Sequence, residues 1–140
     1  AHLADIAALA ARHAYAGLFL ALYGELGAGK TAFVRALGAA LGEHEVKSPT
    51  FIILDEHATL LHVDAYRLSS AQELYDTGYL DYLGRKRITA MEWPENVPEA
   101  LPRERLDLYL TGSGEGPRGL RFVARGSRPQ AMLKEMFPCC

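Results

Sequence analysis

The sequence predicts an α/β fold in which helices flank a mixed β-sheet with parallel and antiparallel strands. A continuous apolar run, Leu18–Tyr23, is followed by a glycine-rich turn and then by an amphipathic helical pattern, an order typical of α/β proteins. Further along, short strand-like runs are joined by short polar turns, which indicates antiparallel pairs. The 140 residues, 49% of them hydrophobic and 23% charged, suit one globular domain.

The N-terminal part alternates helix, strand and helix. Apolar residues recur at helical spacing from Leu3 and predict a helix that ends at Gly17. The run Leu18–Tyr23 is short and apolar throughout, which favours a central strand buried on both faces. After the glycine-rich turn, apolar residues repeat at i, i+3, i+4, i+7 and i+8 from Phe33, and this spacing predicts a second helix closed by Gly42.

Five further strands are expected in the rest of the chain. Phe51–Leu54 and Leu60–Val63 are separated by a short polar stretch and predict a hairpin. Arg87–Trp93 alternates before a proline and reads as another strand. Arg105–Leu110 and Leu120–Ala124 flank a glycine-rich turn and predict a second antiparallel pair.

The segment between the strands and the C-terminal end carry weaker patterns. Leu68–Leu83 is predicted to be helical in part, capped by Ser69 or Ser70 and interrupted at Gly78. We expect residues 1–126 to form the single domain and residues 127–140, Ser127–Cys140, to form a surface-lying or mobile tail. Three apolar side chains are expected to anchor this tail: Met132, Met136 and Phe137.

Charge and hydropathy exclude several classes of protein. A net charge of -2 argues against a strongly basic nucleic-acid-binding surface, although the run Arg85-Lys86-Arg87 is a local basic patch. No apolar run approaches the roughly 20 residues needed to span a bilayer, and no secretory leader is visible, so we expect a cytoplasmic protein without membrane contact. Cys139 and Cys140 are adjacent, so they have no metal-site spacing.

The glycine-rich turn has the spacing of a phosphate-binding loop. Gly24–Thr31 reads GELGAGKT and matches G-x-x-x-x-G-K-[ST] at every fixed position. Such loops turn backbone N–H groups toward phosphate oxygens, and the helix that follows adds the positive end of its dipole. The motif predicts a P-loop NTPase-like fold that binds ATP with Mg²⁺; the alternative is a glycine-rich structural turn. The predicted nucleotide-binding residues are Gly24, Glu25, Leu26, Gly27, Ala28, Gly29, Lys30 and Thr31.

Two carboxylates at strand ends are candidates for the metal side of this site. Thr31 is the expected hydroxyl ligand of Mg²⁺ in the motif. Asp64 ends an apolar strand and is the best candidate for a metal-side carboxylate; the less favoured alternative is a cap of the next turn. Glu92 also ends a strand and is expected to hold metal-bound water or act as a base, unless it is simply exposed. Thr50 is a candidate switch-loop residue that senses phosphate or magnesium.

Four motifs together resemble the TsaE family. They are GELGAGKT at Gly24–Thr31, KSPTF at Lys47–Phe51, HVDAYR at His62–Arg67 and EWPE at Glu92–Glu95, in the family's order and spacing. The resemblance implies a bacterial ATPase required for the threonylcarbamoyl modification of tRNA adenosine 37. It implies action with a TsaB–TsaD partner complex, and contact with tRNA that is indirect, through that complex.

The resemblance also implies roles for individual residues. Lys30 and Thr31 are placed on phosphate and magnesium, Asp64 in the metal-side carboxylate role, and Glu92 near the metal or the attacking water. Hydrolysis is expected to be slow without the partner. The alternative from a different class is a small-molecule P-loop kinase, since such enzymes share the loop and helix, but nothing in the sequence marks an acceptor site.

Overall fold

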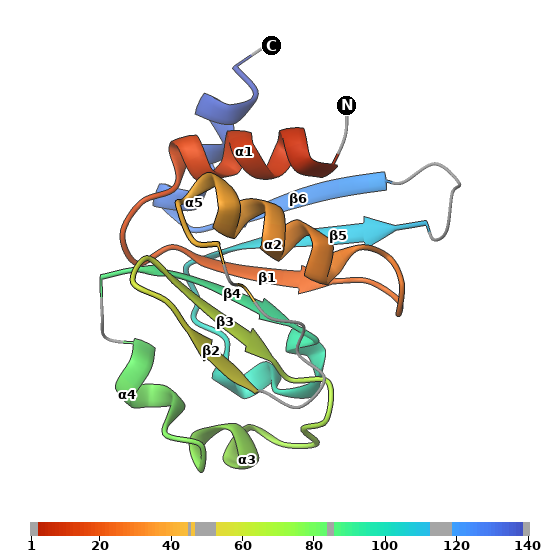
Figure 1. Ribbon diagram of the computed structural model, residues 1–140, viewed down its shortest axis with the longest axis vertical. Coiled ribbons are helices and arrows are strands. Elements are labelled where there is room, and N and C mark those ends of the chain that lie inside the picture. The colour runs from red at the N-terminus through yellow and green to blue at the C-terminus, as the bar shows by residue number, and fades with distance from the viewer. Residues whose placement is uncertain (1–2, 45, 47–52, 84–85, 113–118, 139–140) are drawn as a thin grey trace.

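The computed structural model describes residues 3–44, 46, 53–83, 86–112 and 119–138, and these form one six-stranded sheet in the order β2-β3-β4-β1-β5-β6 (Figure 1). The strands are β1 Phe19–Tyr23, β2 Leu54–Glu56, β3 Leu60–Asp64, β4 Ile88–Glu92, β5 Arg105–Thr111 and β6 Gly119–Arg125.

The sheet has a parallel centre and antiparallel edges. Strands β3, β4, β1 and β5 run parallel, whereas β2 pairs antiparallel with β3 and β6 pairs antiparallel with β5. Because parallel neighbours end at the same edge, the carboxyl ends of β1, β3 and β4 lie together. This arrangement confirms the predicted α/β class with a mixed sheet and both predicted antiparallel pairs.

Helices cover the sheet on its two faces. The long helices α1 Leu3–His13 and α2 Lys30–Ala40 pack together with α5 Ser127–Met136 on one face. Four short helices pack on the opposite face of the sheet: α3 Ala71–Tyr75, α4 Tyr79–Leu83 and the 3₁₀ helices η1 Pro94–Asn96 and η2 Pro98–Ala100.

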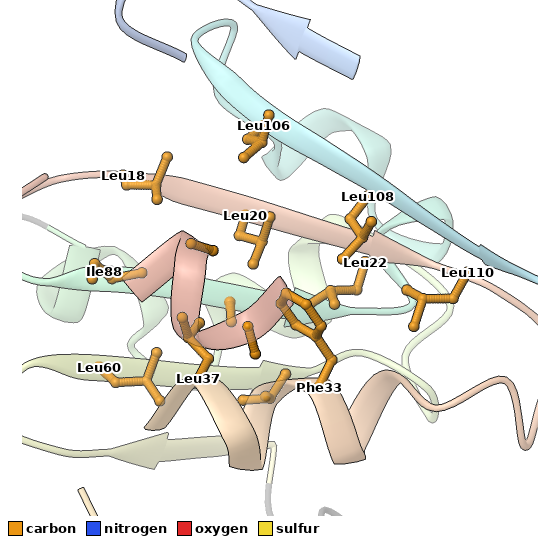
Figure 2. Packing of buried hydrophobic residues seen from close by; sticks show 14 of the residues in the cluster. Leu18, Leu20, Leu22, Phe33, Leu37, Leu60, Ile88, Leu106, Leu108 and Leu110 are labelled. Carbon is orange, nitrogen blue, oxygen red and sulfur yellow. The ribbon is translucent and has the colours of Figure 1, made fainter. Parts of the chain in front are cut away.

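Strand β1 supplies apolar side chains to both cores. Leu20 and Leu22 pack toward the long helices, where Phe33 of α2 meets them (Figure 2). Phe19 and Ala21 alternate to the opposite face and pack with the short helices. Because successive side chains of a strand point to opposite faces, a central strand must be apolar throughout, as Leu18–Tyr23 predicts.

The interrupted helix after β3 follows the expected turn chemistry. The hydroxyl of Ser70 accepts a bond of 3.3 Å from the backbone N–H of Glu73 and so caps α3. Gly78 separates α3 from α4 and has a φ of 87°, a left-handed conformation that glycine adopts without steric cost. Both expectations are confirmed.

The expectation of a tail over Ser127–Cys140 is wrong for its first ten residues, which form α5. Pro129 lies in the first turn of the helix, where a missing N–H does no harm. Met132 and Met136 are buried against the main core, as expected of anchors, while Phe137 is exposed. The cysteines Cys139 and Cys140 lie outside the described residues, and so does the start of the expected strand Phe51–Leu54.

Within the described residues, none of the helices has both the length and the apolar composition needed to cross a membrane.

Candidate functional site

The glycine-rich loop joins the carboxyl end of β1 to the amino end of α2. Gly29 precedes the helix with a φ of 107° and a ψ of 15°, and it has no side chain to cap the first turn. The first backbone N–H groups of α2 therefore remain available to an anion at the helix end, where the dipole is positive. At the start of the loop, a Cβ on Gly24 would lie 2.7 Å from the backbone oxygen of Leu110, so only glycine fits there.

Lys30 lies folded against its own loop. Its side chain is 5% exposed, its ammonium donates to the backbone oxygen of Gly24, and Nζ lies 3.5 Å from the ring centroid of Trp93. Burial lowers the pKa of Lys30, and the nearby carboxylate of Glu92 opposes this shift in part. The buried cation thus rests on a carbonyl and an aromatic face, neither of which neutralises its charge.

Thr31, Glu92 and His62 form a compact polar group under α2. The Thr31 hydroxyl lies 3.0 Å from both carboxylate oxygens of Glu92, and Nε2 of His62 lies 2.7 Å from Oε2 of Glu92. Glu92 is 3% exposed and His62 is 2% exposed. A carboxylate this deeply buried requires such donors, because an unpaired buried charge is strongly unfavourable.

Asp64 lies beside Glu92 but outside this group. The two residues are register partners on the parallel strands β3 and β4. Burial raises the pKa of Asp64, and the neighbouring Glu92 charge adds to the shift, while a bond of 3.0 Å from the backbone N–H of Tyr66 opposes it. Within the described part of the chain, the Thr31 hydroxyl bonds to Glu92 and not to Asp64.

Trp93 has a strained backbone directly after Glu92. It is the one non-glycine residue with positive φ among those described, at φ 59° and ψ 46°. This conformation is costly for a bulky side chain and persists only where the surroundings impose it. Here its ring packs at 5.1 Å on that of Tyr66, and the Asn96 amide ties the chain to the backbone oxygens of Ala65 and Tyr66, at 2.9 and 3.2 Å.

The structure thus gathers most of the residues that the sequence singled out. Lys30, Thr31, Asp64 and Glu92 meet where β1, β3 and β4 end. At the loop tip, Glu25, Leu26 and Gly27 are exposed and Ala28 is buried. Thr50 lies outside the described residues, so its role as a switch residue stays a prediction.

Two contacts were not predicted by sequence reasoning. His62 opens the HVDAYR motif without a role assigned from the sequence, and the structure shows its partner to be Glu92. The position of Lys30 on the Trp93 ring had no local signal, because the residues lie on different elements.

The basic run after α4 does not form an open cationic patch in its described part. Arg87 is buried and pairs at 2.7 Å with Glu56, while it also donates to the backbone oxygens of His57 and Tyr82. Lys86 is exposed and Arg85 is outside the described residues.

Comparison with known proteins gives a consistent result. The family model described as "Threonylcarbamoyl adenosine biosynthesis protein TsaE" matches residues 1–120. The protein of that family from Bacillus subtilis (strain 168) is 36% identical over 136 residues, which cover 94% of this chain and 85% of that protein. The one from Haemophilus influenzae is 34% identical over 122 residues, covering 81% and 74%. Both are described as tRNA threonylcarbamoyladenosine biosynthesis proteins TsaE.

A solved structure is similar over the same extent. The crystal structure of YdiB from Bacillus subtilis superposes with a TM-score of 0.79 at 31% identity, and it covers 96% of this chain and 86% of that one. The described sheet and its flanking helices therefore have the same fold as that protein.

Proposed function

The chain belongs to the TsaE family of tRNA threonylcarbamoyladenosine biosynthesis proteins, and we propose that it serves this pathway as a Mg²⁺-dependent ATPase. The observation that carries the proposal is the bond from the Thr31 hydroxyl to the buried carboxylate of Glu92, at the foot of the glycine-rich loop. A phosphate-binding loop alone supports nucleotide binding, whereas hydrolysis also needs a metal site and a positioned water.

The loop and the end of α2 supply the phosphate-binding groups. Helix α2 begins at Lys30 without a side-chain cap. Its first backbone N–H groups and the positive end of its dipole are therefore available to phosphate oxygens. Lys30 leaves the Gly24 oxygen and the Trp93 ring when phosphates bind, because a phosphate offers a full negative charge in direct contact, which neither the carbonyl nor the ring supplies. ATP is thus bound by exchange of weak contacts of Lys30 for strong ones.

The oxygen ligands at the site fit Mg²⁺. This ion binds proteins through one or two carboxylates together with substrate phosphates and waters. Thr31, Glu92 and Asp64 provide a hydroxyl and two carboxylates at adjoining strand ends, in keeping with that requirement. No group of three or more histidine, cysteine or acidic side chains able to hold a metal occurs among the described residues, so phosphate oxygens would complete the site. When bound, Mg²⁺ supplies neutralisation of phosphate charge.

The two carboxylates have different roles in this proposal. Glu92, fixed by Thr31 and His62, orients the attacking water and accepts its proton. Asp64, which ends β3 beside Glu92 and accepts one bond from the backbone N–H of Tyr66, supplies the second metal-side carboxylate. Both remain within the metal-side role proposed from the sequence.

The partner is the TsaB–TsaD complex, and the reaction is slow without it. Among the described residues, no arginine contacts Lys30, Thr31 or Glu92, so the cation that stabilises developing charge in fast phosphoryl transfer is missing from the site as described. A partner that supplies or orders such a group would accelerate turnover.

Phosphate release by wild-type protein, Lys30→Ala and Lys134→Ala, with and without purified TsaB–TsaD, tests the proposal. Lys134 is an exposed lysine on α5 and serves as the control. We expect Lys30→Ala to lose about 10²-fold or more of the activity and Lys134→Ala to retain it. Turnover by Lys30→Ala equal to that of wild type would refute the proposed site, and transfer of phosphate to a small metabolite would favour a kinase.

A further inference from the structure

Part of the sheet is left without covering helices. On the face opposite α1, α2 and α5, the buried cluster draws its described residues from β1, β3, β4 and the short helices, and none from β5 or β6. In Figure 1 the short helices lie near β2, β3 and β4, away from the β5–β6 hairpin. On this face of β5 and β6, Arg121 and Arg125 are exposed, Arg105 and Tyr109 are partly exposed, and Asp107 is buried beneath its neighbours.

A row of stacked side chains crosses this uncovered face. Tyr23 of β1 and Tyr109 of β5 are register partners, and their rings stack with centroids 4.6 Å apart at 12° between planes. Arg121 of β6 is the partner of Tyr109 on the other side, and its Cζ lies 4.5 Å from that ring centroid. The guanidinium of Arg121 therefore packs over the ring of Tyr109 in a cation–π contact.

A buried aspartate fixes two more arginines next to this row. Asp107 is 0% exposed and accepts bonds from Nε of Arg105 at 2.9 Å and from Nε of Arg125 at 2.5 Å. The side chain of Arg125 is 46% exposed. Together with Arg121, which packs on Tyr109, this face carries three arginines and one aspartate. It therefore has an excess of positive charge, although the net charge of the whole chain is negative.

We propose that this tyrosine–arginine face, made of Tyr23, Arg105, Tyr109, Arg121 and Arg125, docks an acidic surface of the partner complex. The inference rests on the proposed partnership with TsaB–TsaD and adds to it the surface that makes the contact. Tyrosine and arginine are the residues enriched at the centres of protein interfaces, and rigidly held ones lose little entropy on binding.

The chemistry of the row favours protein over single-stranded RNA. RNA-binding sheets offer free aromatic faces on which bases stack. Here both faces of Tyr109 are covered, one by Tyr23 and the other by Arg121. The arginine N–H groups bind carboxylates and phosphates alike, so it is the covered ring of Tyr109, with no face left for a base, that favours a protein surface.

The face also adjoins the nucleotide site. Tyr23 ends β1 and is followed directly by Gly24, the first residue of the loop. A partner bound to the row thus touches β1, the strand that leads into the loop. A change in the nucleotide bound at the loop can therefore alter the contact between the protein and its partner.

Binding of purified TsaB–TsaD to wild-type protein, Arg121→Glu and Arg128→Glu, by calorimetry at two salt concentrations, tests the inference. Arg128 is a matched control because it is exposed and its Cζ lies 3.9 Å from the ring of Tyr15, which packs with the core on the other face of the sheet. We expect Arg121→Glu to weaken binding about tenfold or more, with a smaller salt dependence, and Arg128→Glu to stay within about twofold of wild type. Melting temperatures and ATP affinity of the three proteins, measured in parallel, confirm that the site is intact.

The outcomes separate the two proposals. If wild-type protein does not bind TsaB–TsaD at all, the partnership itself is wrong. If it binds and Arg121→Glu binds equally well, or both variants weaken binding alike, the docking face is wrong. Binding of unmodified tRNA by the isolated protein that Arg121→Glu abolishes would overturn the protein-docking assignment in favour of RNA.

Discussion

Replacing Glu92 with glutamine removes a buried charge and keeps its shape, which isolates its chemical role. The carboxylate is 3% exposed and receives the Thr31 hydroxyl at 3.0 Å and Nε2 of His62 at 2.7 Å. Glutamine retains one acceptor oxygen, and its amide can face the Thr31 oxygen instead. The fold should therefore tolerate Glu92→Gln. The variant lacks the charged carboxylate that would orient metal-bound water and accept its proton.

The two effects differ enough in size to be told apart. Positioned general bases contribute about 10²–10⁴-fold to rates, which corresponds to about 3–5 kcal/mol of barrier. In the folded state, two bonds to a charged acceptor become bonds to a neutral one, a loss of about 1–3 kcal/mol. Removal of the buried charge offsets part of that loss, so we expect unfolding free energy to change by about 2 kcal/mol at most.

The assay is Mg²⁺-dependent phosphate release, with chemical denaturation of the same samples. Glu99→Gln changes an exposed glutamate of η2 and is the control. We expect Glu92→Gln to bind ATP, to melt near wild type and to lose about 10²-fold or more of its turnover. If its turnover stays within about twofold of wild type while that of Lys30→Ala is lost, Glu92 has no role in the chemistry.

Three further results are expected. Trp93 is the single tryptophan, and its emission should change when ATP draws Lys30 off its ring; a titration in which the spectrum stays constant while ATP binds would contradict the exchange of contacts. Because the folded-state pKa of Asp64 is raised, mainly by burial, the folded chain binds more protons there than the unfolded chain, so this group costs stability as pH rises from about 3.8 through its folded value. Without Mg²⁺, Asp64→Asn should therefore gain stability over wild type at pH 7 relative to pH 4 in urea unfolding, and a pH-independent difference would count against this. Gly24→Ala should lower the free energy of unfolding by about 1–3 kcal/mol, because its Cβ would lie 2.7 Å from a backbone oxygen. An unaltered urea midpoint would show that the loop has room for a Cβ.

The local parts of the site could be predicted from sequence. The loop needs glycines at fixed positions between a strand and a helix, and all of these are neighbours in the chain. The carboxylates were found because strands end at Asp64 and Glu92. Which of them reaches Thr31 could not be found, because that depends on β4 lying between β3 and β1, and the bonded residues are 61 positions apart.

Two other features lay beyond sequence reasoning for physical reasons. Helix α5 buries Pro129, Met132 and Met136, too few positions to give a clear helical period, and its proline resembles a helix breaker until its place in the first turn is known. The row of Tyr109 and Arg121 reads as ordinary alternation along β5 and β6, and only the positions of the helices show that its face is uncovered.

Titration of ATP into the purified protein, with Mg²⁺ and with a chelator, tests the central claim most directly. The proposed site predicts saturable binding of one ATP per chain that is strengthened by Mg²⁺ and lost in Lys30→Ala, since the ammonium and the Thr31–Glu92 group act on the same phosphates. Absence of binding by wild-type protein, or equal binding by Lys30→Ala, would contradict it.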